Sequence, residues 1–250
     1  YGIVKRPDLK YAPAAPAETP QLMGEDVFDQ IDRRDWLLYH PYYSFAPVVH
    51  LMQRAAEDPT VRSIRQTLYR VSGNSPIVAA LAQAAENGKS VTVLFEAHAR
   101  FDEENNLYWG ERLRRAGCRV LYGLPHLKVH SKITLFEREV NGQVRREVHL
   151  GTGNYHDGTA KLYTDFGLLT ADPGLTDDAV AFFDLLEGKE GEMHQMVKAP
   201  DMLQPKLLTL FEREMSHARE GRPARIVAKM NSLCDPKMMR ALMEAGQAGV

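Results

Sequence analysis

Hydrophobic and polar positions along the middle of the chain predict strands and helices in alternation. Residues 64–71 alternate with the two-residue period of a strand, and residues 91–97 form a largely apolar run typical of a central strand covered on both faces. Residues 48–57 and 106–116 show helical periodicity. Because strands and helices alternate, the pattern predicts an α/β fold in which helices flank a β-sheet.

Cap and turn residues predict where further elements begin. Ser75-Pro76 and Asp235-Pro236 are typical helix starts, Thr176 is expected to cap a helix that runs to Leu186, and residues 205–220 predict another helix. Further strands are expected at residues 119–122, 127–136, 144–150 and 225–230, with 36–43 as an edge strand or loop. Asn141-Gly142 is a strong hairpin signal, so the sheet is expected to be mixed.

The chain divides into three parts on this reading. Residues 1–24 are rich in proline and alanine and predict an extended arm. Residues 25–222 are expected to form one lobe, and residues 223–250 to begin a second, truncated lobe. The second lobe is inferred because residues 225–250 repeat the order of a strand, a helix cap and a helix expected in residues 64–88. Chance similarity between two such units is the alternative. Since the chain also opens on Tyr1, we expect a piece of a longer protein.

Composition narrows the class of protein. Hydrophobic residues make up 44% and charged residues 26%, which is ordinary for a globular protein. The longest apolar runs have the length of strands, so neither a membrane span nor a signal peptide is expected. Cys118 and Cys234 are isolated, which indicates reduced thiols and a cytoplasmic protein. A net charge of −2 argues against a broadly basic nucleic-acid binder, so any polyanion has to be held by a local cluster.

The expected strand at residues 127–136 carries the candidate chemistry. Alternation would place imidazoles and ammonium groups on one face and apolar side chains on the other. The polar face is expected to hold His126, Lys128, His130, Lys132 and Thr134. Lysines can hold phosphate charge and a neutral imidazole can attack phosphorus. A half-exposed strand with a polar outer face is the alternative.

The sequence after this strand strengthens the functional interpretation. The expected hairpin returns into Gly151-Thr152-Gly153-Asn154, where glycines allow tight turns and Asn154 adds a side-chain donor and acceptor. A His-x-Lys strand, a hairpin and Gly-x-Gly-Asn resemble the half-site of the phospholipase D superfamily. Glu137 stands where that family normally has an acid, so its role here is open.

Longer sequence words resemble the bacterial polyphosphate kinase family of the long, two-lobed type. The words are "TLYRV" at 67–71, "EAHARFDEENN" at 96–106, "HLKVHSK" at 126–132 and "HLGTGNYHDGTAKLYTDFGLLT" at 149–170. The resemblance runs from about Asp35 to Val250. It implies a phospholipase D-like lobe built on a mixed sheet flanked by helices.

The resemblance also implies roles for single residues. His130 matches the histidine that becomes phosphorylated, and His149 matches a second histidine implicated in activity. Arg70 and Arg100 match arginines beside the phosphates and the Mg²⁺ site, and Tyr163 matches a nucleotide-contacting tyrosine. Because arginines are cations, a Mg²⁺ there would have to sit on the phosphates themselves.

The residues themselves support part of this assignment. His130 has to be neutral to attack, and its other ring nitrogen needs an orienting acceptor, which Asp165 or Glu137 could supply; we prefer Asp165. Lys128 and Lys132 could neutralise charge on a transferred phosphoryl group. The alternative for Arg100 is a surface ion pair with a neighbouring acid.

We therefore expect a phosphotransferase that moves the terminal phosphate of ATP to and from polyphosphate through phosphohistidine at His130. The implied partners are ATP or ADP and polyphosphate, without nucleic acid. The implied full-length protein is a cytoplasmic homo-oligomer, with peripheral attachment to the inner membrane as an open alternative. The rival functions are a phospholipase D-like phosphodiesterase or nuclease, and a polyphosphate-binding fragment without turnover.

Overall fold

The computed structural model of the chain describes residues 6–9, 11, 15–96, 103–123, 127–230 and 232–250, and only the backbone of residues 7 and 103–105. It forms two compact units, Tyr1–Glu192 and Met193–Val250. The strands are β1 (Trp36–His40), β2 (Val61–Leu68), β3 (Ser90–Phe95), β4 (Arg119–Tyr122), β5 (Lys132–Val140), β6 (Gln143–Gly151) and β7 (Asp165–Thr170). The α-helices are α1 (Val27–Arg33), α2 (Ala46–Glu57), α3 (Pro76–Glu86), α4 (Glu103–Arg115), α5 (Pro173–Leu186), α6 (Leu203–Arg219) and α7 (Pro236–Gln247). Short 3₁₀ helices occur at Pro7–Leu9, Pro20–Leu22 and Thr159–Lys161.

One mixed sheet organises the first unit, as the sequence predicted. Its strand order is β1-β7-β6-β5-β2-β3-β4. Strands β2, β3 and β4 are parallel to one another, whereas β1, β7, β6, β5 and β2 pair antiparallel in that order. The parallel strands are joined through α3 and α4, and β5 and β6 form a hairpin.

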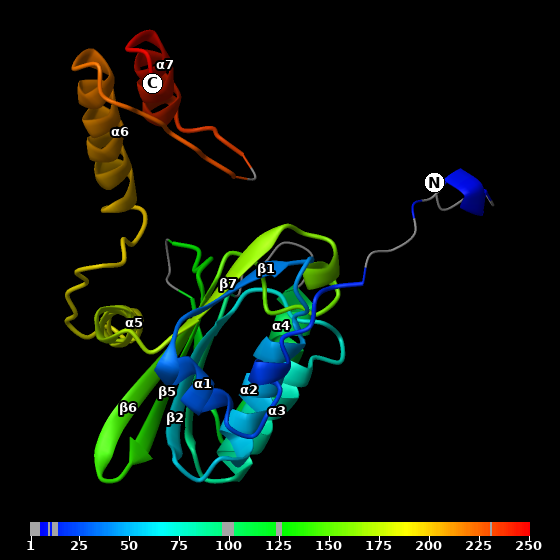
Figure 1. The fold of residues 1–250 in the computed structure, drawn as a ribbon. Helices are drawn as coiled ribbons and strands as arrows, with labels where there is room; N and C mark the ends of the chain where they lie inside the picture. Colours follow the sequence, from blue (N-terminus) through cyan, green and yellow to red (C-terminus); the bar gives the residue numbers. More distant parts are fainter. Residues whose placement is uncertain (1–5, 10, 12–14, 97–102, 124–126, 231) are drawn as a thin grey trace. The chain divides into compact units, whose positions relative to one another are not determined.

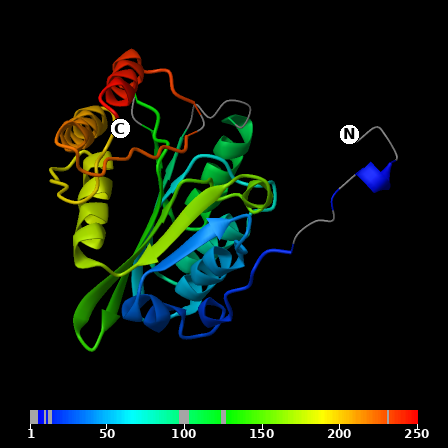
Figure 2. The ribbon, with the colours of Figure 1, turned by 45° about the horizontal axis from the view of Figure 1, so that its top comes forward.

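Helices cover both faces of this sheet (Figure 1). Helices α1 to α4 lie on one face, where the main hydrophobic core includes Ile31, Leu51, Leu81 and Phe136. Helix α5, shown in yellow, lies on the opposite face of the sheet (Figure 2). The apolar side chains of these helices and strands explain why the alternating pattern could predict the architecture.

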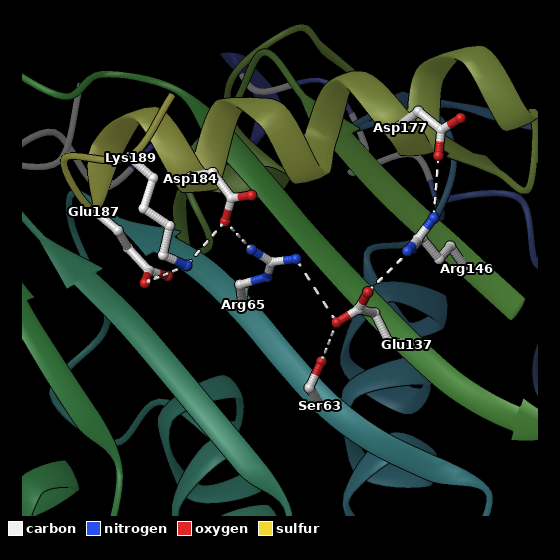
Figure 3. A network of polar contacts seen from close by, with 8 residues as sticks. All are labelled: Ser63, Arg65, Glu137, Arg146, Asp177, Asp184, Glu187 and Lys189. Atoms are coloured by element: carbon white, nitrogen blue, oxygen red, sulfur yellow. Dashed lines mark hydrogen bonds and ion pairs between the residues drawn. The ribbon is translucent and has the colours of Figure 1, made fainter. Parts of the chain in front are cut away.

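A polar network fastens α5 to its face of the sheet (Figure 3). Arg65 of β2 pairs with Asp184 of α5 at 3.0 Å and with Glu137 of β5 at 3.6 Å. Glu137 also accepts hydrogen bonds from Ser63 at 2.7 Å and from Arg146 at 3.0 Å. Burial acts to raise the pKa of Glu137, but these partners outweigh burial and hold the pKa below its ordinary value.

Cap and turn residues correctly predicted where two helices begin and where the hairpin turns. The Ser75 side chain accepts from the Val78 amide, and Asp235 accepts from the amides of Lys237 and Met238. Asn141 and Gly142 both have positive φ, 54° and 74°, which is the two-residue turn expected between β5 and β6. Helix α5 differs from expectation because Asp172, three residues before Leu175, accepts the Leu175 amide and caps it, while Thr176 lies inside the helix.

Two expected strands are corrected by the structure. Strand β5 begins at Lys132 rather than at residue 127, because β2 ends at Leu68 and β6 ends at Gly151, which lies opposite Lys132. Residues 225–230 form no strand, because no neighbouring strand of the described chain pairs with them. A strand-forming pattern gives a strand only where a partner backbone is available.

The second unit consists of α6 and α7 with the extended segment between them. Phe211, Met238 and Ala241 form its small apolar cluster, and Gln204 donates to Asp235 at 2.7 Å. The unit therefore begins at Met193, whereas the sequence pattern suggested a division at 222/223. In the part of the chain that the structure describes, no helix has the length and apolar character needed to cross a membrane.

Candidate active site

The candidate residues gather at one edge of the sheet because the strands that carry them end or begin there. Strands β2 and β3 reach this edge at their carboxyl ends, Leu68 and Phe95. Strand β5 begins there with Lys132, and β7 begins there with Asp165. Ligand sites in α/β proteins commonly form beyond the carboxyl ends of parallel strands. The topology thus brings together residues that lie almost 100 positions apart in sequence.

His130 and Lys132 form the centre of this edge. Lys132 Nζ lies 2.9 Å from His130 Nδ1 and donates to the His130 carbonyl oxygen at 2.5 Å. The Lys132 side chain is buried, whereas His130 is exposed. His130 precedes the strand, so it does not continue an alternating strand face as the sequence suggested. Lys132 and Thr134 do share a face, while Leu127 is 47% exposed instead of packed.

Two residues that the sequence analysis did not single out hold the His130 segment. The buried carboxylate of Glu96, directly after β3, accepts from the Val129 amide at 2.7 Å. The Tyr69 ring, directly after β2, meets the His130 ring edge-to-face with centroids 4.6 Å apart. The backbone before His130 and the ring itself are therefore fixed by groups at the ends of parallel strands. A charged residue at the end of an apolar strand is the signal that could have identified Glu96.

The surroundings keep His130 neutral. The groups around the His130 ring partly shield it from water, which lowers its pKa below the ordinary 6.5; the charges of Lys132 and Arg70 lower the pKa further, against the opposing effect of Glu96. Lys128, which is exposed, also acts to lower the pKa. A neutral imidazole at neutral pH is the state that nucleophilic attack requires.

The pKa of Lys132 is also shifted from its ordinary value. Burial lowers its pKa to about 8, and the positive charge of Arg70 adds to this shift while Asp165 opposes it. An ammonium group with a pKa this close to neutrality can give up a proton under ordinary conditions. Lys132 can therefore act either as a donor to His130 Nδ1 or, once deprotonated, as an acceptor from it.

Asp165 lies at the site but does not contact His130 as an orienting acceptor. It accepts from the Thr152 hydroxyl at 2.8 Å and acts electrostatically on Lys132. Among the described residues, the hydrogen-bonding partner of the His130 ring is Lys132. Glu137, the other candidate acceptor, lies in the α5 network on the opposite face of the sheet (Figure 3).

His149 is buried beneath this edge rather than exposed to a ligand. Its side chain is 3% exposed, and its Nδ1 lies 2.7 Å from the Tyr155 hydroxyl. Burial, assisted by nearby His40, lowers its pKa to about 3, so it remains neutral. A Cβ on Gly151 would stand 3.2 Å from His149 Cε1 and 3.5 Å from Lys132 Cβ, so Gly151 lies between the His149 ring and the base of Lys132.

The other expected site residues are distributed around this centre. Arg70 is half-buried two residues after the end of β2, with its guanidinium carbon 5.8 Å from the Tyr69 ring centroid. Tyr163 is 62% exposed, so its ring is accessible to a ligand. Asn154 is half-buried. Arg100 and His126 lie outside the described residues.

The side chains that the structure describes at this edge do not fit a metal ion held by protein ligands. Within the described ranges, no group of three or more histidine, cysteine or acidic residues could hold a metal. Lys132 contacts the His130 ring and Arg70 lies close enough to lower its pKa, and both are cations that repel Mg²⁺. Among the described residues, Mg²⁺ therefore fits this edge as a companion of phosphate oxygens.

Comparison with known families decides the assignment of the chain. The model described as "Polyphosphate kinase C-terminal domain 1" matches residues 26–192, and the model described as "Polyphosphate kinase C-terminal domain 2" matches residues 196–250. The chain belongs to the polyphosphate kinase family. The two matches divide close to the boundary between the two compact units.

Similar proteins carry the same description. The chain is 50% identical over 242 residues to a polyphosphate kinase of Bacillus cereus, covering 95% of this chain and 34% of the relative. It is 49% identical over 253 residues to a polyphosphate kinase of Pseudomonas aeruginosa, covering 100% of this chain and 36% of the relative. The chain thus spans about a third of the length of these curated relatives.

A solved structure shows the same fold. The crystal structure of polyphosphate kinase from Porphyromonas gingivalis superposes with a TM-score of 0.86 and 36% identity, covering 98% of this chain and 41% of that chain. Nuc, a phospholipase D family member from Salmonella typhimurium, gives a TM-score of 0.48 and 16% identity over 65% of this chain and 98% of its own. The expected fold class, a mixed sheet flanked by helices, is confirmed.

Proposed function

We propose that this chain contributes the phosphohistidine half-site of a polyphosphate kinase, which transfers the γ-phosphate of ATP reversibly to polyphosphate. Membership of the family supports the reaction class. The observation that carries the proposal is the His130–Lys132 pair, an exposed neutral imidazole bonded to a buried lysine of lowered pKa. In such a pair the imidazole can act as the nucleophile and the lysine can activate it.

His130 would attack through Nε2, because Lys132 occupies Nδ1. A bond forms between Nε2 and the γ-phosphorus as the bond from that phosphorus to the β–γ bridging oxygen breaks, and ADP leaves with the electron pair. Nε2 offers a lone pair when the ring proton is on Nδ1. That tautomer is held when neutral Lys132 accepts the Nδ1 proton as a hydrogen bond.

The cations at the sheet edge would hold the substrate. Arg70 and Lys128 lie close enough to His130 to lower its pKa, so they are placed to attract phosphate oxygens near the reacting nitrogen. Arg100 is proposed to act with Arg70, and Tyr163 to contact the nucleotide. ATP, ADP, polyphosphate and Mg²⁺ bound to phosphates belong to this proposal, as do homo-oligomer formation and a cytoplasmic site of action.

The test is labelling of a protein of the relatives' length that carries this sequence. With γ-labelled ATP, the unchanged protein is expected to take up acid-labile, base-stable label, and His130→Ala to take up none. His217→Ala, a half-buried histidine of α6, serves as the matched control and should label normally. Undiminished labelling of His130→Ala would reject the assignment. Cleavage of phosphodiester substrates without nucleotide would instead support the phosphodiesterase alternative.

The 250-residue chain alone is expected to show little or no polyphosphate synthesis, because it spans about a third of the relatives' length. Synthesis at the rate of the longer protein would show that the half-site is sufficient.

A further inference from the structure

Two buried histidines from different strands direct their Nε2 atoms toward one point. His40, at the end of β1, is 4% exposed, and His149 of β6 is 3% exposed. Gly167 of β7 lies between them in the sheet. A Cβ on Gly167 would stand 3.0 Å from His149 Nε2 and 3.4 Å from His40 Nε2. In the described part of the chain neither Nε2 has a hydrogen-bond partner.

A third buried polar atom belongs to the same place. The side-chain oxygen Oδ1 of Asn154 is buried and likewise has no partner among the residues described. His40, His149, Asn154 and Gly167 all line one cavity of about 10 Å³. That volume is just enough for one water molecule, and a buried water typically makes two to four hydrogen bonds. A buried polar atom left without a partner loses its hydrogen bond to water and gains none in return, so a bound water stabilises the folded state here.

The protonation of His40 follows from its other nitrogen. His40 Nδ1 lies 2.9 Å from the carbonyl oxygen of Tyr43, which can only accept. The ring proton of neutral His40 is therefore on Nδ1. Its Nε2 consequently presents a lone pair to the cavity.

In His149 the ring proton is on the other nitrogen, Nε2. The Tyr155 hydroxyl accepts from Thr134 Oγ1 at 2.8 Å, so its own proton is directed to His149 Nδ1 at 2.7 Å. Nδ1 is thus an acceptor. In the neutral ring, which the lowered pKa of His149 maintains, the proton is on Nε2 and points into the cavity as a donor.

We propose that one water molecule is bound between His40, His149 and Asn154, and that His40 is a positioning residue for His149. The water accepts from His149 Nε2–H and donates one proton to His40 Nε2 and the other to Asn154 Oδ1. One acceptor role and two donor roles match the three groups without remainder. The hydrogen-bonded chain then runs from Thr134 through Tyr155, His149 and the water to His40.

This chain of hydrogen bonds ends one residue away from the candidate active site, because only Gly151 separates His149 from Lys132. Gly151 lies between the His149 ring and the base of Lys132, and Lys132 is hydrogen-bonded to the His130 ring. Fixing the tautomer and tilt of His149 therefore fixes the ring that stands on the other side of Gly151 from Lys132. His40 reaches the reacting group only through these intermediates.

Histidine side-chain NMR of the ¹⁵N-labelled 250-residue chain tests the protonation pattern. His149 is expected to carry its proton on Nε2 and His40 on Nδ1. His40→Phe should change the His149 Nε2–H signal and accelerate its exchange with solvent at least about tenfold, whereas His40→Gln, which can still accept, should restore slow exchange. His50→Phe, a ring bonded to the Gly24 carbonyl oxygen, is the control and should leave His149 unchanged.

A second variant leaves all the polar groups in place. Gly167→Ala puts a methyl group at the water position and is expected to perturb His149 as His40→Phe does, while Gly73→Ala, whose Cβ would meet nothing within 4 Å, should not. A crystal structure should show one water with three bonds at this point. A proton on His149 Nδ1, Zn²⁺ bound between the two rings, or an unaltered His149 signal in both variants would overturn the proposal.

Discussion

Lys132 contacts His130 twice, through ring Nδ1 at 2.9 Å and through the carbonyl oxygen at 2.5 Å. One buried side chain therefore fixes both the backbone and the ring of the proposed nucleophile. Lys132 is the first residue of β5, and His130 lies two residues before it, outside the strand. The start of this strand thus lies at the centre of the site.

Substituting Lys132 with arginine tests whether this position needs only a positive charge or a side chain that can lose its proton. Burial lowers the pKa of Lys132 to about 8, so the neutral form needed to accept from Nδ1 becomes more abundant as pH rises toward 8. The single-turnover rate of His130 phosphorylation is expected to rise up to about tenfold per pH unit below that value and then level off. Lys132→Arg cannot deprotonate, so it should be at least about tenfold slower and lose this step.

Lys128→Arg is the matched control, since the exposed Lys128 has no place in this proton exchange. It should keep the pH step. A Lys132→Arg rate and pH profile identical to those of the unchanged protein would show that Lys132 serves only as a charge.

Glu96 is predicted to fix the position of His130 through the Val129 amide and to raise the pKa of the His130 ring. Glu96→Gln removes the charge that opposes the lowering of the His130 pKa, so NMR titration should find a still lower His130 pKa. Glu96→Ala leaves the buried Val129 amide without its partner and is expected to slow phosphorylation by about tenfold or more. Glu111→Gln, on exposed α4, should change neither quantity. An unchanged His130 titration in Glu96→Gln would contradict this role.

His149 is predicted to make the fold sensitive to acid. Its folded pKa of about 3 lies below the ordinary 6.5, so between these values the unfolded chain binds a proton that the folded chain refuses. The free energy of unfolding should therefore fall as pH falls through this window, by up to about 1.4 kcal/mol per pH unit from this residue. His149→Gln should flatten this slope in urea titrations between about pH 6 and pH 4.

Thr134→Val provides the comparison, because it disturbs the same polar cluster without changing the number of ionisable groups. It should lower stability by about 1 kcal/mol and retain the slope. Equal slopes in all three proteins would mean that another group causes the acid sensitivity.

Glu137 is predicted to stabilise the fold without taking part in phosphoryl transfer. Glu137→Gln weakens the pairing with Arg65 and Arg146 that fastens α5, and is expected to cost about 1–2 kcal/mol of unfolding free energy. Labelling of His130 should stay within about twofold of normal. Loss of labelling in a folded Glu137→Gln protein would restore the role of the acid that the phospholipase D resemblance suggested.

The sequence predicted elements best where the determining residues are neighbours. Ser75 capped its helix and Asn141-Gly142 turned its hairpin as expected, because a cap or a turn depends on a few consecutive residues. The start of β5 was misplaced because it depends on where β2 and β6 end, which is information that lies far along the chain.

The same distinction applies to the site. His130 and Lys132 were recognisable from their spacing, and the structure joins them directly. Glu96 and Tyr69 were not singled out, because their contacts with Val129 and His130 cross between strand ends more than thirty residues apart. Asp165 was expected to orient His130, but it accepts a hydrogen bond from Thr152. The register of β6 and β7 determines which partner Asp165 meets.

The β5–β6 hairpin carries a practical consequence. Lys132 stands at one end of β5 and the exposed Asn141-Gly142 turn follows its other end, a strand length of about 26 Å away. A fluorophore or an affinity tag inserted at this tip would protrude from the molecule well away from the reactive imidazole. The hairpin tip therefore offers an attachment point for tethering the protein to a surface while substrates approach from the opposite end.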